Sequence, residues 1–312
     1  MNLGMDFGMP APQGAVFAPA QAFILSARDR DARQARAVCL EAARLALRAL
    51  YAELRLYPKP GLVSLIDNGS HQDMNAITFM RSLFSLRHYF AAICRAGAAG
   101  APFATLKQLG IEAERRMMSA TRGVNTHRGA IFSLGLLCAA LGRAHAQGAA
   151  LSPAMLRAVL LATWGEELGR HMQADGADSH GLRAAAQHAA SGAREEGALG
   201  LPSVFEVGLP ALRRTLARGG DMRHARTDAL FALMAHISDT NVVHRGGMRG
   251  AQLVRDEARR FIALGGTGNP AWREQALACH RLFVRRRLSP GGAADLLAAT
   301  CLVHAVTSRH WP

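Results

Sequence analysis

Polar side chains that could bind phosphate or move protons are concentrated in one stretch, residues Tyr57–Phe79 (YPKPGLVSLIDNGSHQDMNAITF). Lys59 has a proline on either side, and the chain's other lysine is Lys107, since arginine is used almost everywhere else. A compact ammonium group is suited to phosphate. We therefore interpret the stretch as an anion-binding loop that also carries His71 and Asp73. A solvated loop between two helices, with a helix cap at Asp73, is the alternative.

Two later arginines stand in a similar local pattern. Arg128 and Arg245 are each followed by two small residues at a predicted helix start. Free backbone N–H groups and the positive end of the helix dipole favour phosphate there. With Lys59 and Arg194 they would supply four cations in four polar loops, which suits a triphosphate plus a pyrophosphate. The alternative is that Arg128 and Arg245 form structural salt bridges.

Asparagine and histidine side chains accompany these cations. An Asn and a His precede each of the two arginines, about 116 residues apart, but the Asn-to-His spacing differs by one residue. We therefore interpret the likeness as convergent loop chemistry rather than as a repeat. The side chains predicted to hydrogen-bond to phosphate or base are His71, Asn125, His127, Asn241 and His244.

Five segments, in order along the chain, resemble the triphosphoribosyl-dephospho-coenzyme A synthases, which make the prosthetic-group precursor of citrate lyase and malonate decarboxylase. They are PKPGLV with NGSHQDMNAITF within 58–79, GVNTHRGAIFSLGLL at 123–137, GAREEGALGLPSV at 192–204, MAHISDTNVVHRGG at 234–247 and LSPGGAADLLAAT at 288–300. The resemblance implies transfer of the triphosphoribosyl group of ATP to the ribose 2′-hydroxyl of 3′-dephospho-coenzyme A, with release of adenine. The first segment looks more like the malonate decarboxylase branch.

The chemistry that the resemblance implies needs a carboxylate to take the proton from the attacking hydroxyl. Glu196 is the first choice, because the family segment has a Glu two positions after the Arg, here Arg194. Glu195 stands where the family pattern is expected to have glycine. Asp73 and Asp239 are the alternative catalytic acids. They are also the predicted Mg²⁺ ligands, directly or through water, because ATP chemistry usually brings Mg²⁺.

The rest of the chain predicts an all-α fold, because apolar residues recur at helical spacing and strand signals are almost absent. We expect one compact multi-helix catalytic domain over 26–312, with polar loops converging on a central nucleotide cleft, and a loose N-terminal tail over 1–25. The expected helices span Asp29–Leu54, Asp73–Arg95, Phe103–Met118, Ala130–Ala146, Pro153–His171, Ser203–Arg218, Arg223–Ile237, Gly247–Leu264, Pro270–Leu288 and Gly292–Val306.

Composition limits the setting. Five cysteines without CxxC spacing indicate reduced, buried thiols. The longest apolar run, Ala130–Gly142, is shorter than the roughly 20 residues of a membrane span, so we expect a soluble, cytoplasmic protein without membrane contact. The formal net charge of +14 favours polyanionic partners, although genome bias towards arginine is an equal explanation.

Two other functions compete with the transferase. One is N-glycosidic hydrolysis of a nucleotide, in which water replaces the acceptor hydroxyl. The other is a non-catalytic basic helical module that binds RNA or an acidic carrier protein, which predicts an arginine stripe with interleaved aromatics. Only 6% of the residues are aromatic and the arginines are dispersed, so we expect ATP and 3′-dephospho-coenzyme A as partners, and no nucleic acid. A homodimer and direct contact with a downstream acyl carrier protein stay open.

Overall fold

The structure is a computed structural model that describes Met1, residues 27–174 and residues 192–308. Within these ranges the secondary structure is helical and no strand occurs, so the predicted all-α fold is confirmed. Apart from Met1, the tail predicted over 1–25 lies outside the described residues. The helices are α1 Ala27–Leu54, α2 Ala76–Ser85, α3 Tyr89–Ala98, α4 Phe103–Ala120, α5 Arg128–Ala146, α6 Pro153–Ala174, the π-helical turn η1 Ser203–Gly208, α8 Leu209–Ala217, α9 Met222–His236, α10 Thr240–Ala263, the 3₁₀ turn η2 Gly266–Gly268, α11 Trp272–Arg286 and α12 Gly291–Thr307.

The helix predicted from Asp73 to Arg95 is wrong in its extent. It is two helices, α2 and α3, and Asn75 rather than Asp73 caps the first, accepting the Thr78 N–H at 3.0 Å. The chain turns between them, and Tyr89 at the start of α3 then enters the core, where its hydroxyl donates to the Ile131 carbonyl at 3.0 Å. Apolar spacing continues through this turn, so periodicity alone did not reveal it.

Two further elements depart from the prediction, and both lie in the polar segments. Residues 192–198, predicted as a loop, are helical. α10 begins at Thr240 rather than at Gly247, but Gly247 interrupts it with a φ of 62° and ψ of −169°. The predicted start therefore corresponds to the second part of a kinked helix, and a residue without a side chain is needed at the kink.

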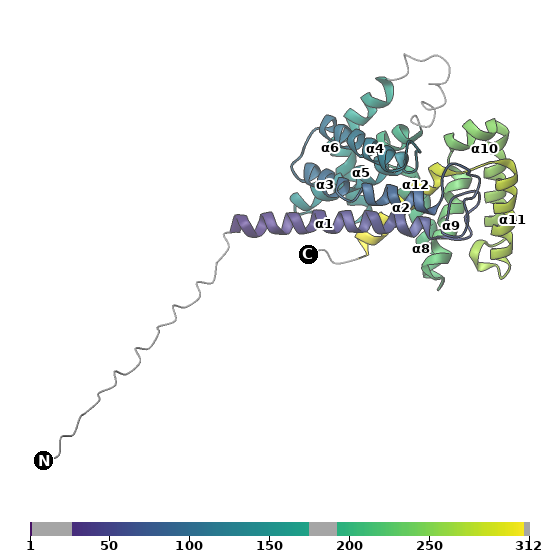
Figure 1. The fold of residues 1–312 in the computed structure, drawn as a ribbon, viewed down its shortest axis with the longest axis horizontal. Helices are drawn as coiled ribbons and strands as arrows, with labels where there is room; N and C mark the ends of the chain where they lie inside the picture. The colour runs from purple at the N-terminus through teal and green to yellow at the C-terminus, as the bar shows by residue number, and fades with distance from the viewer. Residues whose placement is uncertain (2–26, 175–191, 309–312) are drawn as a thin grey trace.

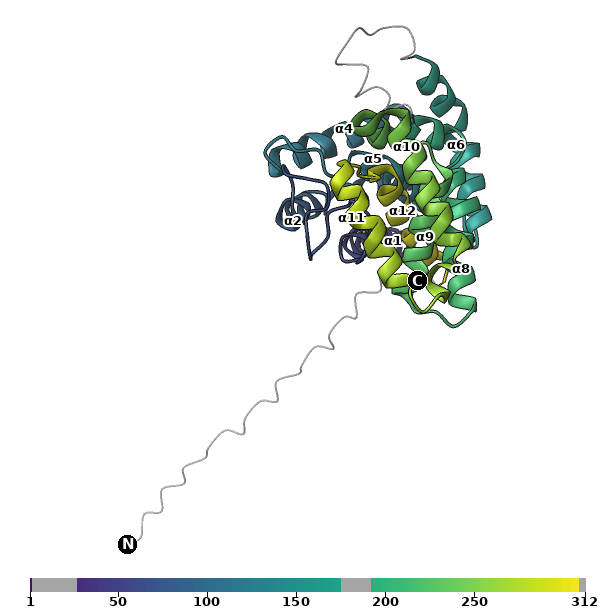
Figure 2. The same ribbon diagram turned by 90° about the vertical axis from the view of Figure 1, so that its right-hand side faces the viewer.

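Helix α12 occupies the middle of the fold. Figure 1 shows α3–α6 on one side of it and α8–α11 on the other, with the long α1 running past both groups, and in Figure 2 the side with α8–α11 faces the viewer. α12 packs against α1, α5 and α9, and α5 packs against α3. The α3–α5 contact is close because it uses glycine: a Cβ at Gly97 would lie 2.1 Å from the Ala139 carbonyl oxygen.

Helix α5 is long, apolar and largely buried. Among the described residues it is the one helix long and apolar enough to cross a membrane, and 72% of that window is buried inside the protein. It therefore has the character of a core helix. The five cysteines are also buried and unbridged, as predicted.

Candidate active site

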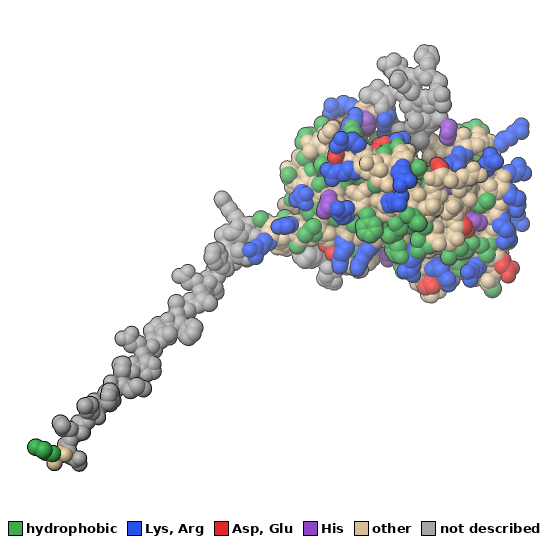
Figure 3. Space-filling model, viewed as in Figure 1, with side chains coloured by type: hydrophobic (Ala, Val, Ile, Leu, Met, Phe, Trp, Pro, Cys, Tyr) green, Lys and Arg blue, Asp and Glu red, His purple; other side chains and the backbone are tan. Residues whose placement is uncertain are grey.

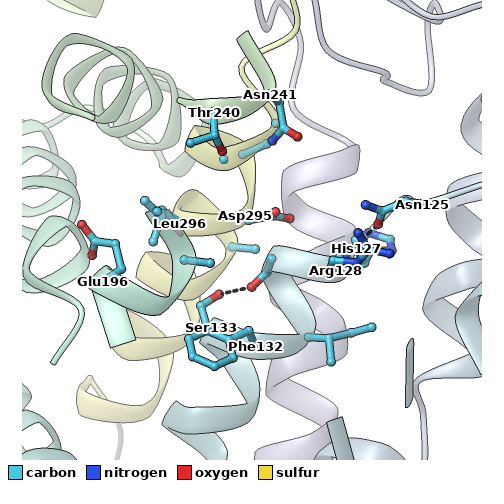
Figure 4. Close-up of a pocket in the computed structure, with 18 of the residues that line it drawn as sticks. Asn125, His127, Arg128, Phe132, Ser133, Glu196, Thr240, Asn241, Asp295 and Leu296 are labelled. Atoms are coloured by element: carbon cyan, nitrogen blue, oxygen red, sulfur yellow. Dashed lines mark hydrogen bonds between the residues drawn. The ribbon is translucent and has the colours of Figure 1, made fainter. Parts of the chain in front are cut away.

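The polar segments converge on one cavity of about 1040 Å³. Its wall is built from the loop before α2, the start of α5, the helix 192–198, the first part of α10 and the start of α12, with α1 and α4 closing it (Figure 4). Every site residue predicted from sequence lines this cavity: Lys59, His71, Asp73, Asn125, His127, Arg128, Arg194, Glu196, Asp239, Asn241, His244 and Arg245. Their individual roles stay predictions.

Lys59 lies at the buried end of the cavity wall, with 1% of its surface exposed. Its ammonium group donates to Oε1 of Glu53, a buried acid on α1 that the sequence analysis did not single out. Burial lowers the pKa of Lys59 and raises the pKa of Glu53, and the mutual attraction opposes both changes. Lys59 is thus an internally paired cation, and its charge is compensated before any ligand arrives.

Asp239 joins the N-termini of two helices. Its Oδ1 accepts the Asn241 N–H of α10 at 3.0 Å, and its Oδ2 accepts the Ala293 N–H of α12 at 3.1 Å. Burial raises the pKa of Asp239, while these backbone N–H groups lower it in part. Because both oxygens already bind backbone groups, this carboxylate holds α10 and α12 in place.

Asp295, on the second turn of α12, is a second acid that the sequence analysis left out of the predicted site. It is partly exposed and lines the cavity, where it lies beside the start of α5. A Cβ on Gly129 would come within 2.3 Å of its Oδ2, so the missing side chain makes room for the carboxyl group. Burial, then Glu53 and Asp239, raise the pKa of Asp295 well above its usual value.

Glu196, the predicted base, comes from the helix 192–198. The Ser203 hydroxyl donates to its Oε1 and the Ser203 N–H donates to its Oε2 at 3.2 Å. Burial raises the pKa of Glu196, against the two Ser203 hydrogen bonds. A positioned carboxylate with a raised pKa is suited to accept a proton near neutral pH. The neighbouring Glu195 is exposed.

His127 is a buried imidazole, 3% exposed, at the cavity wall. Its Nδ1 lies 2.6 Å from the Ser82 hydroxyl, and its Nε2 is buried without a hydrogen-bond partner among the described residues. Burial, aided by the charge of Lys59, lowers its pKa to about 3. A neutral ring with one unused nitrogen can hydrogen-bond to a bound molecule.

A different environment surrounds His71 and Arg245. The Arg245 guanidinium, which is exposed, donates to His71 Nδ1 at 3.1 Å. The other ring nitrogen, Nε2, is 2.8 Å from the Ser289 hydroxyl. Asp73 Oδ1 is 3.4 Å from the same Nδ1. The guanidinium is thus exposed at the cavity, whereas the imidazole beside it is largely buried, with 8% of its side-chain surface exposed.

Arg128 is engaged by an acid, as the salt-bridge alternative predicted. Its Nε donates to Glu114 of α4 at 2.6 Å, and Asn125 Oδ1 accepts the Arg128 backbone N–H at 3.1 Å. Residue 128 begins α5, so its predicted place at a helix start is confirmed. Its guanidinium remains partly exposed towards the cavity.

The carboxylates do not form a ready metal site. Within residues 27–174 and 192–308 no three His, Cys, Asp or Glu side chains lie where they could hold one ion together. Asp239 uses both oxygens as a helix cap. Asp73 is exposed, so it can contribute one oxygen to an ion that brings its other ligands along.

Comparison with known proteins gives a consistent result. A sequence model of the family described as ATP:dephospho-CoA triphosphoribosyl transferase matches residues 39–311. The chain is 43% identical over 256 residues to a probable 2-(5″-triphosphoribosyl)-3′-dephosphocoenzyme-A synthase of Acinetobacter calcoaceticus, covering 82% of this chain and 87% of the relative. It is 39% identical over 271 residues to the 2-(5″-triphosphoribosyl)-3′-dephosphocoenzyme-A synthase of Pectobacterium atrosepticum, covering 85% and 87%. No solved structure gives a significant match.

Proposed function

The chain belongs to the ATP:dephospho-CoA triphosphoribosyl transferase family, and on that premise we propose that it transfers the triphosphoribosyl group of ATP to the ribose 2′-hydroxyl of 3′-dephospho-coenzyme A and releases adenine. The observation that carries the proposal is the convergence of residues from five distant segments on one cavity. At about 1040 Å³ the cavity is at the upper end of small-molecule sites, which supports two nucleotide substrates side by side.

In this proposal Glu196 is the general base. Its two hydrogen bonds from Ser203 fix the carboxylate, and its raised pKa lets it take the proton of the attacking hydroxyl. General base catalysis of this kind contributes about 10²–10⁴-fold to rate. The attack forms the bond from the hydroxyl oxygen to the ribose C1″ of ATP while the bond from C1″ to adenine breaks.

The phosphates of ATP remain intact and are the groups through which the enzyme binds the nucleotide. We assign them to Arg245 and His71, because that arginine is exposed at the cavity, whereas Lys59 and Arg128 already pair with acids. Mg²⁺ is proposed as an ion held mainly by the phosphate oxygens and water, with Asp73 as the protein ligand that fits.

The test is mass spectrometry of the purified protein with ATP, Mg²⁺ and 3′-dephospho-coenzyme A, each omitted in turn. We expect free adenine together with a coenzyme adduct heavier by one triphosphoribosyl unit, only when all three are present. Adenine without the adduct would support the N-glycosidic hydrolase instead. No adenine under any condition would refute both enzyme functions.

A matched pair of variants tests the base. Glu196→Gln keeps the shape of the side chain but removes the basic oxygen, so we expect turnover to fall about 10²–10⁴-fold. Glu166→Gln makes the same chemical change at an exposed position outside the cavity lining and is the control. Equal losses in the two variants would contradict the assignment.

The finer biological assignment is also a proposal. We propose that the product serves malonate decarboxylase, because the sequence of residues 57–75 resembles that branch of the family more closely. We also propose that the enzyme acts in the cytoplasm. A deletion strain that loses growth on malonate and keeps growth on citrate would support this branch, and the reverse would overturn it. The binding-module alternative is not favoured, because Figure 3 shows Lys and Arg in scattered groups over the visible face rather than in one stripe.

A further inference from the structure

The proposed transfer leaves one proton unaccounted for. When the bond from C1″ to adenine breaks, the electron pair goes to the base, and adenine departs easily only if a ring nitrogen has received a proton. Glu196 accepts a proton from the acceptor hydroxyl and cannot supply one at the same step. The site therefore needs an acid on another part of the cavity wall.

Asp295 has the required position. It comes from α12, whereas Glu196 comes from the helix 192–198, and in Figure 4 Asp295 lies between Glu196 on one side and the Asn125–Arg128 segment on the other. The Asp295 side chain is partly exposed, whereas its neighbours in α12 are buried. Its exposed part therefore faces the cavity that it lines. Its carboxyl group is thus within reach of a nucleotide bound in the cavity.

The surroundings of Asp295 are shaped to hold this carboxyl group. The backbone N–H of Ala130 hydrogen-bonds to it from the first turn of α5. Gly129 leaves the space beside it, since any larger residue would place a Cβ 2.3 Å from Oδ2. A group anchored on one side and open on the other keeps a constant direction into the cavity.

The electrostatics favour the protonated form. Burial is the largest effect on the pKa of Asp295, and the negative charges of Glu53 and Asp239 raise it further, while the Ala130 N–H opposes them. The ammonium group of Lys59, which also lines the cavity, is paired with Glu53. Arg128, at the start of α5, is paired with Glu114. Burial lowers the pKa of His127 to about 3, so its ring adds no positive charge. Asp295 therefore stays protonated to a higher pH than an exposed aspartic acid does.

From this placement we propose that Asp295 is the general acid that protonates the departing adenine. The inference rests on the proposed function. One proton passes from the 2′-hydroxyl to Glu196, one passes from Asp295 to a ring nitrogen of adenine, and the C1″ carbon exchanges its bond to nitrogen for a bond to oxygen. After product release, solvent returns a proton to Asp295 and removes one from Glu196.

The deciding experiment compares ATP with 7-methyladenosine 5′-triphosphate, whose positively charged base leaves as a neutral molecule without further protonation. Asp295→Asn should lose about 10²–10⁴-fold in turnover with ATP, as removal of a general acid does. With the methylated nucleotide the turnover of Asp295→Asn should stay within a factor of about ten of that of the unaltered enzyme, because the departing base needs no acid. Glu196→Gln should be slow with both nucleotides.

The outcomes separate the two proposals. If the unaltered enzyme makes no adduct from ATP, the proposed function fails. If it makes the adduct but Asp295→Asn is equally impaired with both nucleotides, Asp295 has a structural role and only the acid assignment is overturned. Thermal unfolding of the variant shows whether it has folded, and Asp295→Glu, which restores an acid, should recover part of the rate with ATP.

A second measurement does not require the cavity to accept a methylated base. The rates with ATP, 2-chloro-ATP and 2-fluoro-ATP report how strongly turnover depends on the leaving ability of the base. An enzyme that protonates the base shows a shallow dependence, so Asp295→Asn should respond more steeply to the better leaving groups. An unchanged dependence in the variant would overturn the assignment.

Discussion

The buried imidazole of His127 predicts a specific dependence of stability on pH. Its folded-state pKa is about 3, below the roughly 6.5 of an unfolded chain. As pH falls through this interval the unfolded state takes up a proton that the folded state rejects. His127 therefore contributes stability that is present above pH 6.5 and is lost towards pH 3, by about 1.4 kcal/mol per pH unit and about 5 kcal/mol in all.

Other buried groups act in the opposite direction. The pKa values of Glu53, Asp239 and Asp295 are raised by burial, so the folded state binds their protons more tightly than the unfolded state does. Their contribution to stability grows as pH falls. The wild-type profile is thus a sum, and only a comparison with a variant that lacks the imidazole isolates His127.

The assay is urea denaturation of wild type and His127→Gln at pH 7.5, 6.5, 5.5 and 5.0. The lost hydrogen bond to Ser82 shifts the variant by a constant amount, so it does not affect the slope. The stability advantage of wild type over the variant should shrink by about 2 kcal/mol between pH 7.5 and pH 5.0. His88→Gln, at an exposed position, is the matched control. An advantage that stays constant with pH would refute the argument that this ring is buried and neutral.

Three further changes test other contacts. Lys59→Met leaves Glu53 buried without its cation, so the free energy of unfolding should fall by about 3–5 kcal/mol, and adding Glu53→Gln should recover most of it in urea denaturation; no recovery would contradict the pairing. Gly129→Ala pushes a methyl group into the carboxyl group of Asp295. The free energy of unfolding should fall by about 1–3 kcal/mol and most of the turnover should be lost. An active, stable variant would show that the space is not needed. Arg245→Ala should raise KM for ATP about 10–100-fold through the loss of a charged hydrogen bond, while Arg249→Ala, also exposed but outside the cavity lining, should not.

Much of the fold followed from local pattern. Apolar residues located α1, α5 and α12 to within two residues at each end, because α1 has a buried face and α5 and α12 are buried on nearly every side. Apolar spacing failed between α2 and α3, where Leu86 is buried on the same spacing although the helix has ended. It also missed the helix 192–198, since a short polar segment carries no apolar stripe to reveal it.

The site was partly visible in the sequence. The predicted residues share one cavity because distinctive polar segments between apolar helices have to lie at the ends of packed helices. The missed acids, Glu53 and Asp295, lie inside apolar helical runs, where a single charged residue looks like part of a solvated face. Glu53 is revealed by its pairing with Lys59, which follows the end of α1, and Asp295 by its contact with the start of α5. The apolar pattern of a helix records neither contact.

The packing of α12 between α1 and α5 has a consequence for how the protein is made. α12 is formed by residues 291–307, yet it packs against residues 27–54 and carries one wall of the cavity. A nascent chain that has reached only residue 286 has all its other described helices but leaves the buried faces of α1 and α5 uncovered. Contacts of such long sequence separation form slowly, and exposed apolar faces invite aggregation meanwhile. Synthesis of α12 is thus the step that allows these faces to be covered and the cavity wall to be completed.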